Sequence, residues 1–163
     1  MNFYKDYVEN GKEYSDYEDF KENFKIKVPE NFNFAYDIVD RYAELEPAKR
    51  AMVWCDDNGE EHFFTFKDFA EKSNQTANFL VKHGIKKGDT VLLILRRRYE
   101  FWYFILALHK IGAIAVPATN QLLSKDIEFR ANAASIKMVV SYQDSLVQQR
   151  IGEAMPASPS VKE

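Results

Sequence analysis

Three short apolar runs stand out along the second half of the chain. Val91–Leu95 is uninterrupted by any polar residue, and Ala113–Pro117 and Met138–Val140 follow it. The first run is too short for a helix and would be apolar on both faces, which is typical of the central strand of a parallel sheet. The pattern therefore predicts three buried strands.

Helical patterns separate these runs. Tyr99–Ile111 is apolar on nearly all sides and ends at Gly112, while Ser124 can cap a short helix with Asp126 in its first turn. Strand, helix, strand, helix, strand predicts an α/β fold: the N-terminal portion of a doubly wound, mostly parallel sheet with right-handed crossovers. We expect the domain to be incomplete, leaving an apolar patch exposed at Val91–Leu95.

The best-marked helix begins at Thr65. Thr65 and Asp68 can form a capping box, Phe64 and Phe69 stand at the staple positions, and Gly84 supplies a left-handed stop. The residues expected on its buried face are Phe66, Phe69, Ala70, Ala77, Leu80 and Val81.

Before that helix, the pattern predicts a β-hairpin and another helix. Asn58-Gly59 between two apolar stretches indicates a hairpin over Ala51–Phe66. Upstream, Asn33 can cap a helix that ends before Pro47. Its expected apolar face consists of Phe34, Ile38, Tyr42 and Leu45.

The two ends of the chain differ from the middle. Residues 1–28 form an acidic and aromatic amphipathic arm, whose stripe either packs on the body or makes the arm a partner-binding helix. The expected stripe is Tyr14, Tyr17, Phe20 and Phe24. Residues 29–154 form the expected partial α/β subdomain, and residues 155–163 an irregular tail or truncation point.

Composition and charge exclude some function classes. With 46% hydrophobic residues, 15% aromatic residues and a net charge of −3, the chain can bury a core and has no basic field for nucleic acid or anionic membranes. Polar residues interrupt Phe101–Ala118, so we expect no membrane span. The polar start resembles no secretory signal, which predicts a cytoplasmic protein.

Little catalytic chemistry is visible. The single cysteine, Cys55, stands among Trp54, Asp56 and Asp57, which favours a structural role. The three histidines are far apart, so we expect no metal site. The six glycines form neither a dinucleotide fingerprint nor a P-loop.

Two polar segments follow predicted strands, where ligands of open α/β sheets bind. Arg96-Arg97-Arg98 could hold a phosphate or carboxylate, or could be a solvated loop partly neutralised by Glu100. Thr119-Asn120-Gln121 can donate and accept hydrogen bonds. Only their position distinguishes them from other polar loops.

Several segments together resemble the start of the adenylate-forming acyl-CoA synthetases, above all the medium-chain and branched-chain enzymes. They are Asn31–Phe34, Phe64–Phe69, His83–Val91, Phe101–Tyr103 and Leu106–Thr119. The resemblance implies that a carboxylic acid and Mg-ATP give an acyl-adenylate and pyrophosphate, after which CoA displaces AMP. It also implies a role in fatty acid metabolism.

The motifs that hold ATP in that family do not occur in this sequence, so no catalytic residue is carried over and we expect the 163-residue chain to be inactive. The resemblance places Thr119, Asn120 and Gln121 on the CoA side of the cleft. The partners that the resemblance implies for the protein are a small, medium or branched acid, ATP, CoA, and the rest of the same polypeptide. The alternative is an autonomous, non-catalytic interaction module.

Overall fold

The computed structural model describes residues 6–9 and 13–162, and it divides into two compact units, residues 1–32 and 33–163. The expected arm falls partly on residues 1–5 and 10–12, and the tail includes residue 163, all of which lie outside the described residues. Among the residues described, no helix is both long and apolar enough to cross a membrane.

The first unit contains helix α1 (Tyr17–Asn23) and an antiparallel pair, β1 (Val8–Glu9) with β2 (Lys25–Ile26). Tyr14, Phe20 and Phe24 pack on one another, with ring centroids 4.7–6.3 Å apart. Tyr17 was expected in this stripe, but it is 71% exposed. Because the helix begins only at Tyr17, Tyr14 reaches the aromatic cluster from non-helical backbone and the helical spacing does not hold.

The second unit is built on the predicted parallel sheet, with strand order β6-β5-β7. The strands are β5 (Thr90–Ile94), β6 (Ile114–Pro117) and β7 (Met138–Ser141). In register, Leu92 of β5 lies between Val116 and Val139. The α/β class and the central position of β5 are thus confirmed.

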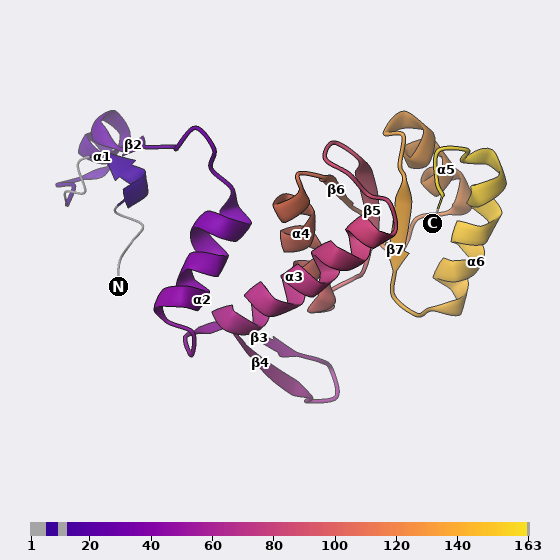
Figure 1. Cartoon of the computed structure of the whole chain (residues 1–163), viewed down its shortest axis with the longest axis horizontal. Coiled ribbons are helices and arrows are strands. Elements are labelled where there is room, and N and C mark those ends of the chain that lie inside the picture. Colours follow the sequence, from indigo (N-terminus) through magenta and orange to yellow (C-terminus); the bar gives the residue numbers. More distant parts are fainter. Residues whose placement is uncertain (1–5, 10–12, 163) are drawn as a thin grey trace. The chain divides into compact units, whose positions relative to one another are not determined.

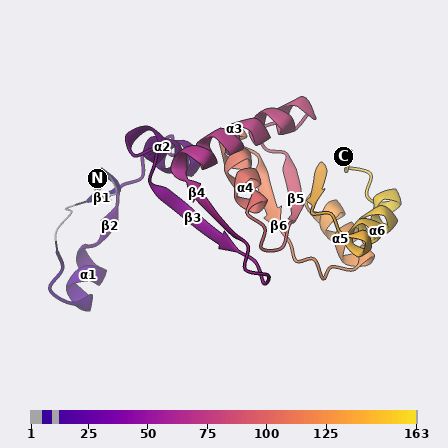
Figure 2. The ribbon, with the colours of Figure 1, turned by 90° about the horizontal axis from the view of Figure 1, so that it is seen from below.

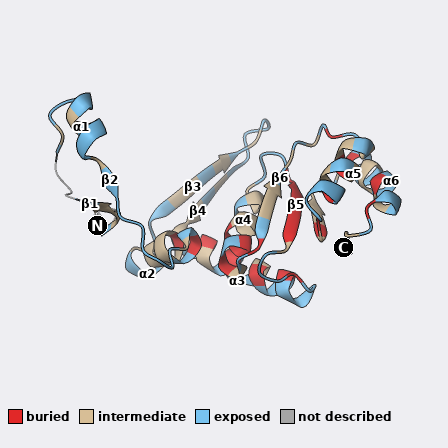
Figure 3. Ribbon diagram, turned by 90° about the horizontal axis from the view of Figure 1, so that it is seen from above, coloured by how far each residue is buried: buried red, intermediate tan, exposed pale blue. Residues whose placement is uncertain are grey.

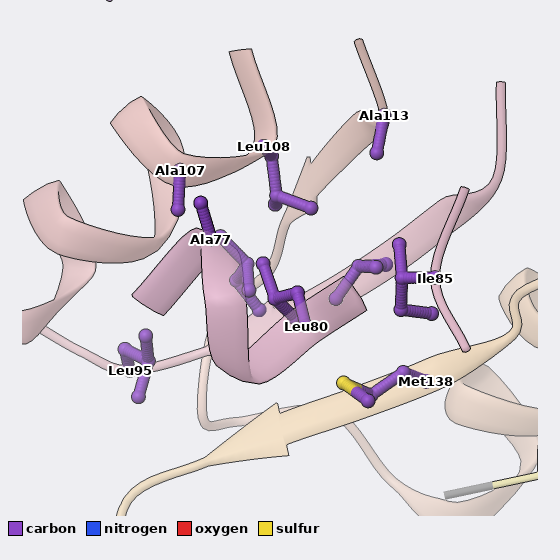
Figure 4. Packing of buried hydrophobic residues seen from close by; sticks show 10 residues of the cluster. Ala77, Leu80, Ile85, Leu95, Ala107, Leu108, Ala113 and Met138 are labelled. Carbon is purple, nitrogen blue, oxygen red and sulfur yellow. The ribbon is translucent and has the colours of Figure 1, made fainter. Parts of the chain in front are cut away.

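Helices cover both faces of this sheet (Figure 1). Helices α3 (Phe66–Lys82) and α4 (Glu100–Ile111) pack on one face, where Ala77, Leu80, Ala107 and Leu108 converge (Figure 4). On the other face lie α5 (Ser124–Ala133) and α6 (Ser145–Ala154), which meet Leu92 and Ile94 through a second cluster. The cluster residues of α5 and α6 are Ile127, Ala131, Val147 and Ala154.

Every residue of β5 is therefore buried (Figure 3). Full burial of one large aliphatic side chain contributes about 1.5–3 kcal/mol, so this strand is the main apolar element of the unit. The expected exposed patch at Val91–Leu95 is wrong, because α5 and α6 supply the missing cover. Sequence patterning did not identify α6, whose outer face is polar.

The segment after α6 was expected to be irregular, and instead it packs on the unit. Met155–Ala157 forms a 3-10 helix, and Ser158 is buried with its hydroxyl donating to the Ala154 carbonyl (2.8 Å). Lys162 N–H donates to the Lys137 carbonyl at the start of β7 (3.0 Å). Tertiary contacts hold this segment in place, and such contacts leave no periodic pattern in the sequence.

The boundaries of α3 are as predicted. Thr65 and Asp68 form the capping box, the rings of Phe64 and Phe69 lie 5.8 Å apart, and Gly84 has φ +85° after the last turn. One expected core residue, Val81, is exposed. Its neighbour Leu80 holds the buried position, and a single residue turns the side chain by about 100° around the helix.

Helix α5 begins one residue earlier than its predicted cap implies. Leu123 occupies the cap position, and its N–H donates to the Asp126 carboxylate (3.0 Å). The Ser124 hydroxyl donates instead to the Glu153 carboxylate of α6. Ser124 therefore joins two helices rather than capping one.

Helix α4 differs from its prediction in one side chain. Burial on most sides was expected, but Trp102 is half exposed.

The predicted hairpin consists of β3 (Arg50–Cys55) and β4 (Glu61–Thr65), paired antiparallel. Figure 2 shows it separated from β5 by α4. At its turn, the Asp56 carboxylate accepts from the N–H groups of Asn58 and Glu60 (both 2.9 Å), and Gly59 alone in the turn is left-handed. The hydrogen bond from Glu60 and the others in the turn lower the pKa of Asp56.

The helix before the hairpin differs in its winding. Asn33 caps it through Ala35 N–H (3.0 Å) as predicted, but Ala35–Asp40 is a π-helix that continues as α2 (Arg41–Leu45). Buried positions are Ala35 and Val39. Phe34 and Leu45, two members of the expected face, are exposed at 49% and 45%. The wider π turn moves residues off the 3.6-residue repeat.

A buried lysine joins the π-helix to α3 and α4. The Lys110 side chain is 1% exposed, and its ammonium lies 2.8 Å from the Asp40 carboxylate. It also donates to the Asn74 side chain (2.8 Å) and the Ala70 carbonyl (3.5 Å). All three donor positions of the ammonium thus have acceptors, as burial of a charge requires.

Replacing Lys110 by Met should lower the free energy of unfolding by about 3 kcal/mol, because the mostly buried Asp40 carboxylate loses its cation. Urea denaturation measures the change, and adding Asp40→Leu should recover most of it. The control Lys67→Met breaks the exposed Lys67–Glu71 pair and should cost less than about 0.5 kcal/mol. Equal costs for the two single variants would contradict a structural role for the network.

Candidate functional site

An open cleft of about 770 Å³ lies at the carboxyl ends of the three parallel strands. Both polar segments singled out in the sequence contribute to it, together with the turn end of the hairpin. Its lining residues are Trp54, Cys55, Asp56, Asp57, Arg96, Arg97, Arg98, Thr119, Asn120 and Tyr142. Segments that are distant in the chain meet here because all three strands point to one sheet edge.

The arginine loop leaves β5 through a tight turn. Arg98 N–H donates to the Leu95 carbonyl (3.2 Å), and Arg96 within that turn has φ +52°. A left-handed residue with a side chain costs about 1–3 kcal/mol, so the surrounding contacts must hold this conformation. The Arg96 guanidinium lies 5.9 Å from the centre of the Tyr142 ring, which places its charge over an aromatic face.

Arg98 differs from its two neighbours because it is already paired. Its guanidinium donates two hydrogen bonds to Glu100, at 3.1 and 2.8 Å. The carboxylate of Glu100 raises the pKa of Arg98 further above its ordinary value. Of the two alternatives for the arginine segment, Arg98 therefore fits the solvated loop residue that Glu100 neutralises. Arg96 and Arg97 form no ion pair within the part of the chain that the structure describes.

The hairpin is fastened to the arginine loop by Trp54. Its indole N–H donates to the Arg97 carbonyl (2.7 Å), and its ring meets Tyr99 edge-on at 5.4 Å. His62 packs beside both rings, and its Nε2 lies 2.6 Å from the Glu60 carboxylate. These contacts fix the hairpin turn, with Asp57, at one side of the cleft.

The loop after β6 faces the segment after β7. The Asn120 amide donates to the Tyr142 hydroxyl (3.4 Å), which donates to the Asp144 carboxylate (3.3 Å). Asp144 also caps α6 by accepting from Val147 N–H, and this hydrogen bond lowers the pKa of Asp144. Gln121 is exposed outside the lining, so only Thr119 and Asn120 of the three predicted residues reach the cleft.

Sequence reasoning missed part of the lining. Tyr142 could have been found, because it lies two residues after the third predicted strand and directly after β7. Trp54, Asp56 and Asp57 could not, since nothing in the local pattern says that the hairpin turn lies beside the sheet edge. A long-range hydrogen bond from Trp54 determines that position.

Residues 39–163 match the protein family described as AMP-binding enzyme. The chain is 35% identical over 145 residues to mouse (Mus musculus) acyl-coenzyme A synthetase ACSM3, a protein named as mitochondrial. It is 36% identical over 123 residues to rat (Rattus norvegicus) ACSM5, also named as mitochondrial. These matches cover 85% and 72% of this chain, but only 25% and 21% of the relatives.

Two solved structures are similar to this chain in fold. A putative long-chain-fatty-acid CoA ligase from Rhodopseudomonas palustris superposes with a TM-score of 0.70 at 25% identity, over 82% of this chain and 32% of that one. The N-terminal subdomain of NpsA from Klebsiella oxytoca superposes with a TM-score of 0.57 at 28% identity, over 64% of this chain and 26% of that one. The chain thus spans about a quarter of the length of the curated relatives it matches.

Replacing Trp54 by Phe should loosen the arginine loop, because the ring remains but the donor to the Arg97 carbonyl is lost. Amide hydrogen exchange at residues 96–99 should become faster, by about the factor of ten that 1–1.5 kcal/mol represents. Trp102→Phe, at a half-exposed position on α4, is the matched control. Unchanged exchange in the Trp54 variant would show that other contacts hold the loop.

Proposed function

Because this chain belongs to the AMP-binding enzyme family, we propose that it is the N-terminal part of an ATP-dependent acyl-CoA synthetase. The observation that carries the proposal is the 35% identity, over 85% of this chain, to a protein named acyl-coenzyme A synthetase. The reaction would convert a carboxylic acid, ATP and CoA into acyl-CoA, AMP and pyrophosphate through an acyl-adenylate. Short, medium or branched fatty acids are the proposed substrates.

Within this reaction the chain would supply scaffold and one side of the CoA site. Thr119 and Asn120 offer a hydroxyl and an amide at the cleft, and Gln121 supports the loop by donating its N–H to the Thr119 hydroxyl (3.3 Å). Stabilisation of the transferring phosphoryl group would come from segments outside this chain. The proposed partners are therefore the acid, ATP, CoA and the rest of the same polypeptide.

Mg²⁺ would accompany ATP, but the side chains that the structure describes do not fit a metal site. Within the described ranges, no three His, Cys, Asp or Glu side chains come together as they would around an ion. We therefore assign no step of the reaction to a metal held by these residues. A cytoplasmic location stays a prediction, as do the domain boundaries at residues 28 and 154.

One observation favours a second candidate function, an autonomous binding module. Both faces of the sheet are covered within residues 33–163, which is what independent folding of this unit needs. The two candidates differ in whether a longer polypeptide containing this chain activates carboxylic acids.

The 163-residue chain alone should show no carboxylate-dependent exchange of labelled pyrophosphate into ATP and no saturable ATP binding at millimolar concentration. The physical reason is that preorganised donors and Mg²⁺ around the phosphates form the largest catalytic term, and this chain lacks a phosphate loop. A longer polypeptide that contains it should catalyse exchange with short or branched fatty acids. Exchange by the chain alone would contradict the first expectation. If the longer polypeptide shows no exchange with any acid, the result would favour the autonomous binding module.

Asn120→Ala in that longer polypeptide should raise the KM for CoA severalfold, since a neutral hydrogen bond contributes about 0.5–1.5 kcal/mol, while adenylate formation changes little. Steady-state kinetics at varied CoA, with pyrophosphate exchange as the control, separates the two steps. An unaltered dependence on CoA would remove Asn120 from the site.

A further inference from the structure

Two of the three arginines at the cleft have charges that the chain leaves unpaired. Arg98 is held by Glu100, but Arg96 and Arg97 line the cleft without an ion pair to any described residue. Arg96 is also one of two non-glycine residues in the described ranges with positive φ. A glycine would take this backbone without strain, so the position carries an arginine side chain at a conformational cost.

The carboxylates around these arginines are mostly engaged elsewhere. Asp56 accepts hydrogen bonds from its own turn, and Asp144 caps α6, although Arg96 lies near enough to contribute to its lowered pKa. Asp57 is the remaining acid of the described lining. The lining thus holds two guanidinium groups and one carboxylate that neither a turn nor a cap engages, which leaves a local excess of positive charge.

From this geometry we propose that Arg96 and Arg97 bind a phosphate group at the nucleotide end of CoA, and that this contact distinguishes CoA from nucleotides without its 3′-phosphate. The inference rests on the proposed function. Guanidinium groups bind phosphate through paired, charge-assisted hydrogen bonds. Thr119 and Asn120 lie in the same cleft and offer groups to the ribose or diphosphate.

The size and character of the cleft suit this ligand. At about 770 Å³ it falls within the usual range for small-molecule sites, so it can hold a phosphorylated nucleoside while the thiol arm extends outward. The Tyr142 ring lies 5.9 Å from the Arg96 guanidinium at the sheet edge, a distance at which cation and ring attract each other. Trp54 holds the backbone of Arg97. Each arginine thus has a contact to an aromatic residue, Arg96 through its guanidinium and Arg97 through its backbone carbonyl.

The test measures binding of CoA, dephospho-CoA and ATP to the 163-residue chain by ligand-observed NMR at low and high salt. CoA should bind about tenfold more tightly than dephospho-CoA, the ratio expected from one charge-assisted contact, and the difference should shrink at high salt. The variants Arg96→Gly and Arg97→Ala should bring the ratio close to one. Arg96→Gly should be at least as stable as the parent, because glycine relieves the left-handed backbone.

Lys86→Ala is the charge-matched control, since Lys86 lies in the loop before β5, at the opposite end of that strand from Arg96. It should leave the ratio unchanged. The proposal is overturned by equal affinity for CoA and dephospho-CoA, by an unchanged ratio in both arginine variants, by ATP binding as tightly as CoA, or by no CoA binding at millimolar concentration. Pyrophosphate exchange by the longer polypeptide needs no CoA, so its failure would count against the proposed function alone.

Discussion

The second unit depends on one constraint, the burial of β5 on both faces. A strand of Val, Leu and Ile cannot face water on either side without losing most of the apolar burial that stabilises the unit. Two helix layers follow from this requirement, α3 with α4 on one face and α5 with α6 on the other. The parallel crossovers then place the carboxyl ends of all three strands at the same edge.

That edge is where polar chemistry can gather without disturbing the core. The arginine loop, the loop after β6 and Tyr142 each begin where a buried strand ends, and the hairpin turn joins them from outside the sheet. The core sets the positions of these loops, while local hydrogen bonds set their side chains: Glu100 holds Arg98, and Trp54 holds the Arg97 carbonyl. The cleft is therefore assembled by the same packing that buries β5.

Membership in the AMP-binding enzyme family agrees with this organisation. The chain matches only about a quarter of its relatives' length, and its cleft offers cations and hydrogen-bonding groups but no metal cluster within the described ranges. A lining of cations and hydrogen-bonding groups suits the binding of a charged ligand. The buried Lys110 network is structural, since it joins the π-helix to α3 and α4.

The sequence by itself determined the features that depend on local chemistry. The three strands, the box of Thr65 with Asp68, and the left-handed stops at Gly84 and Gly112 follow from neighbouring residues, as does the α/β class. Only the tertiary structure decided the cover of β5 by α6, the packing of residues 155–162 and the pairing of Lys110 with Asp40. These features depend on contacts between residues far apart in the chain, which no local pattern encodes.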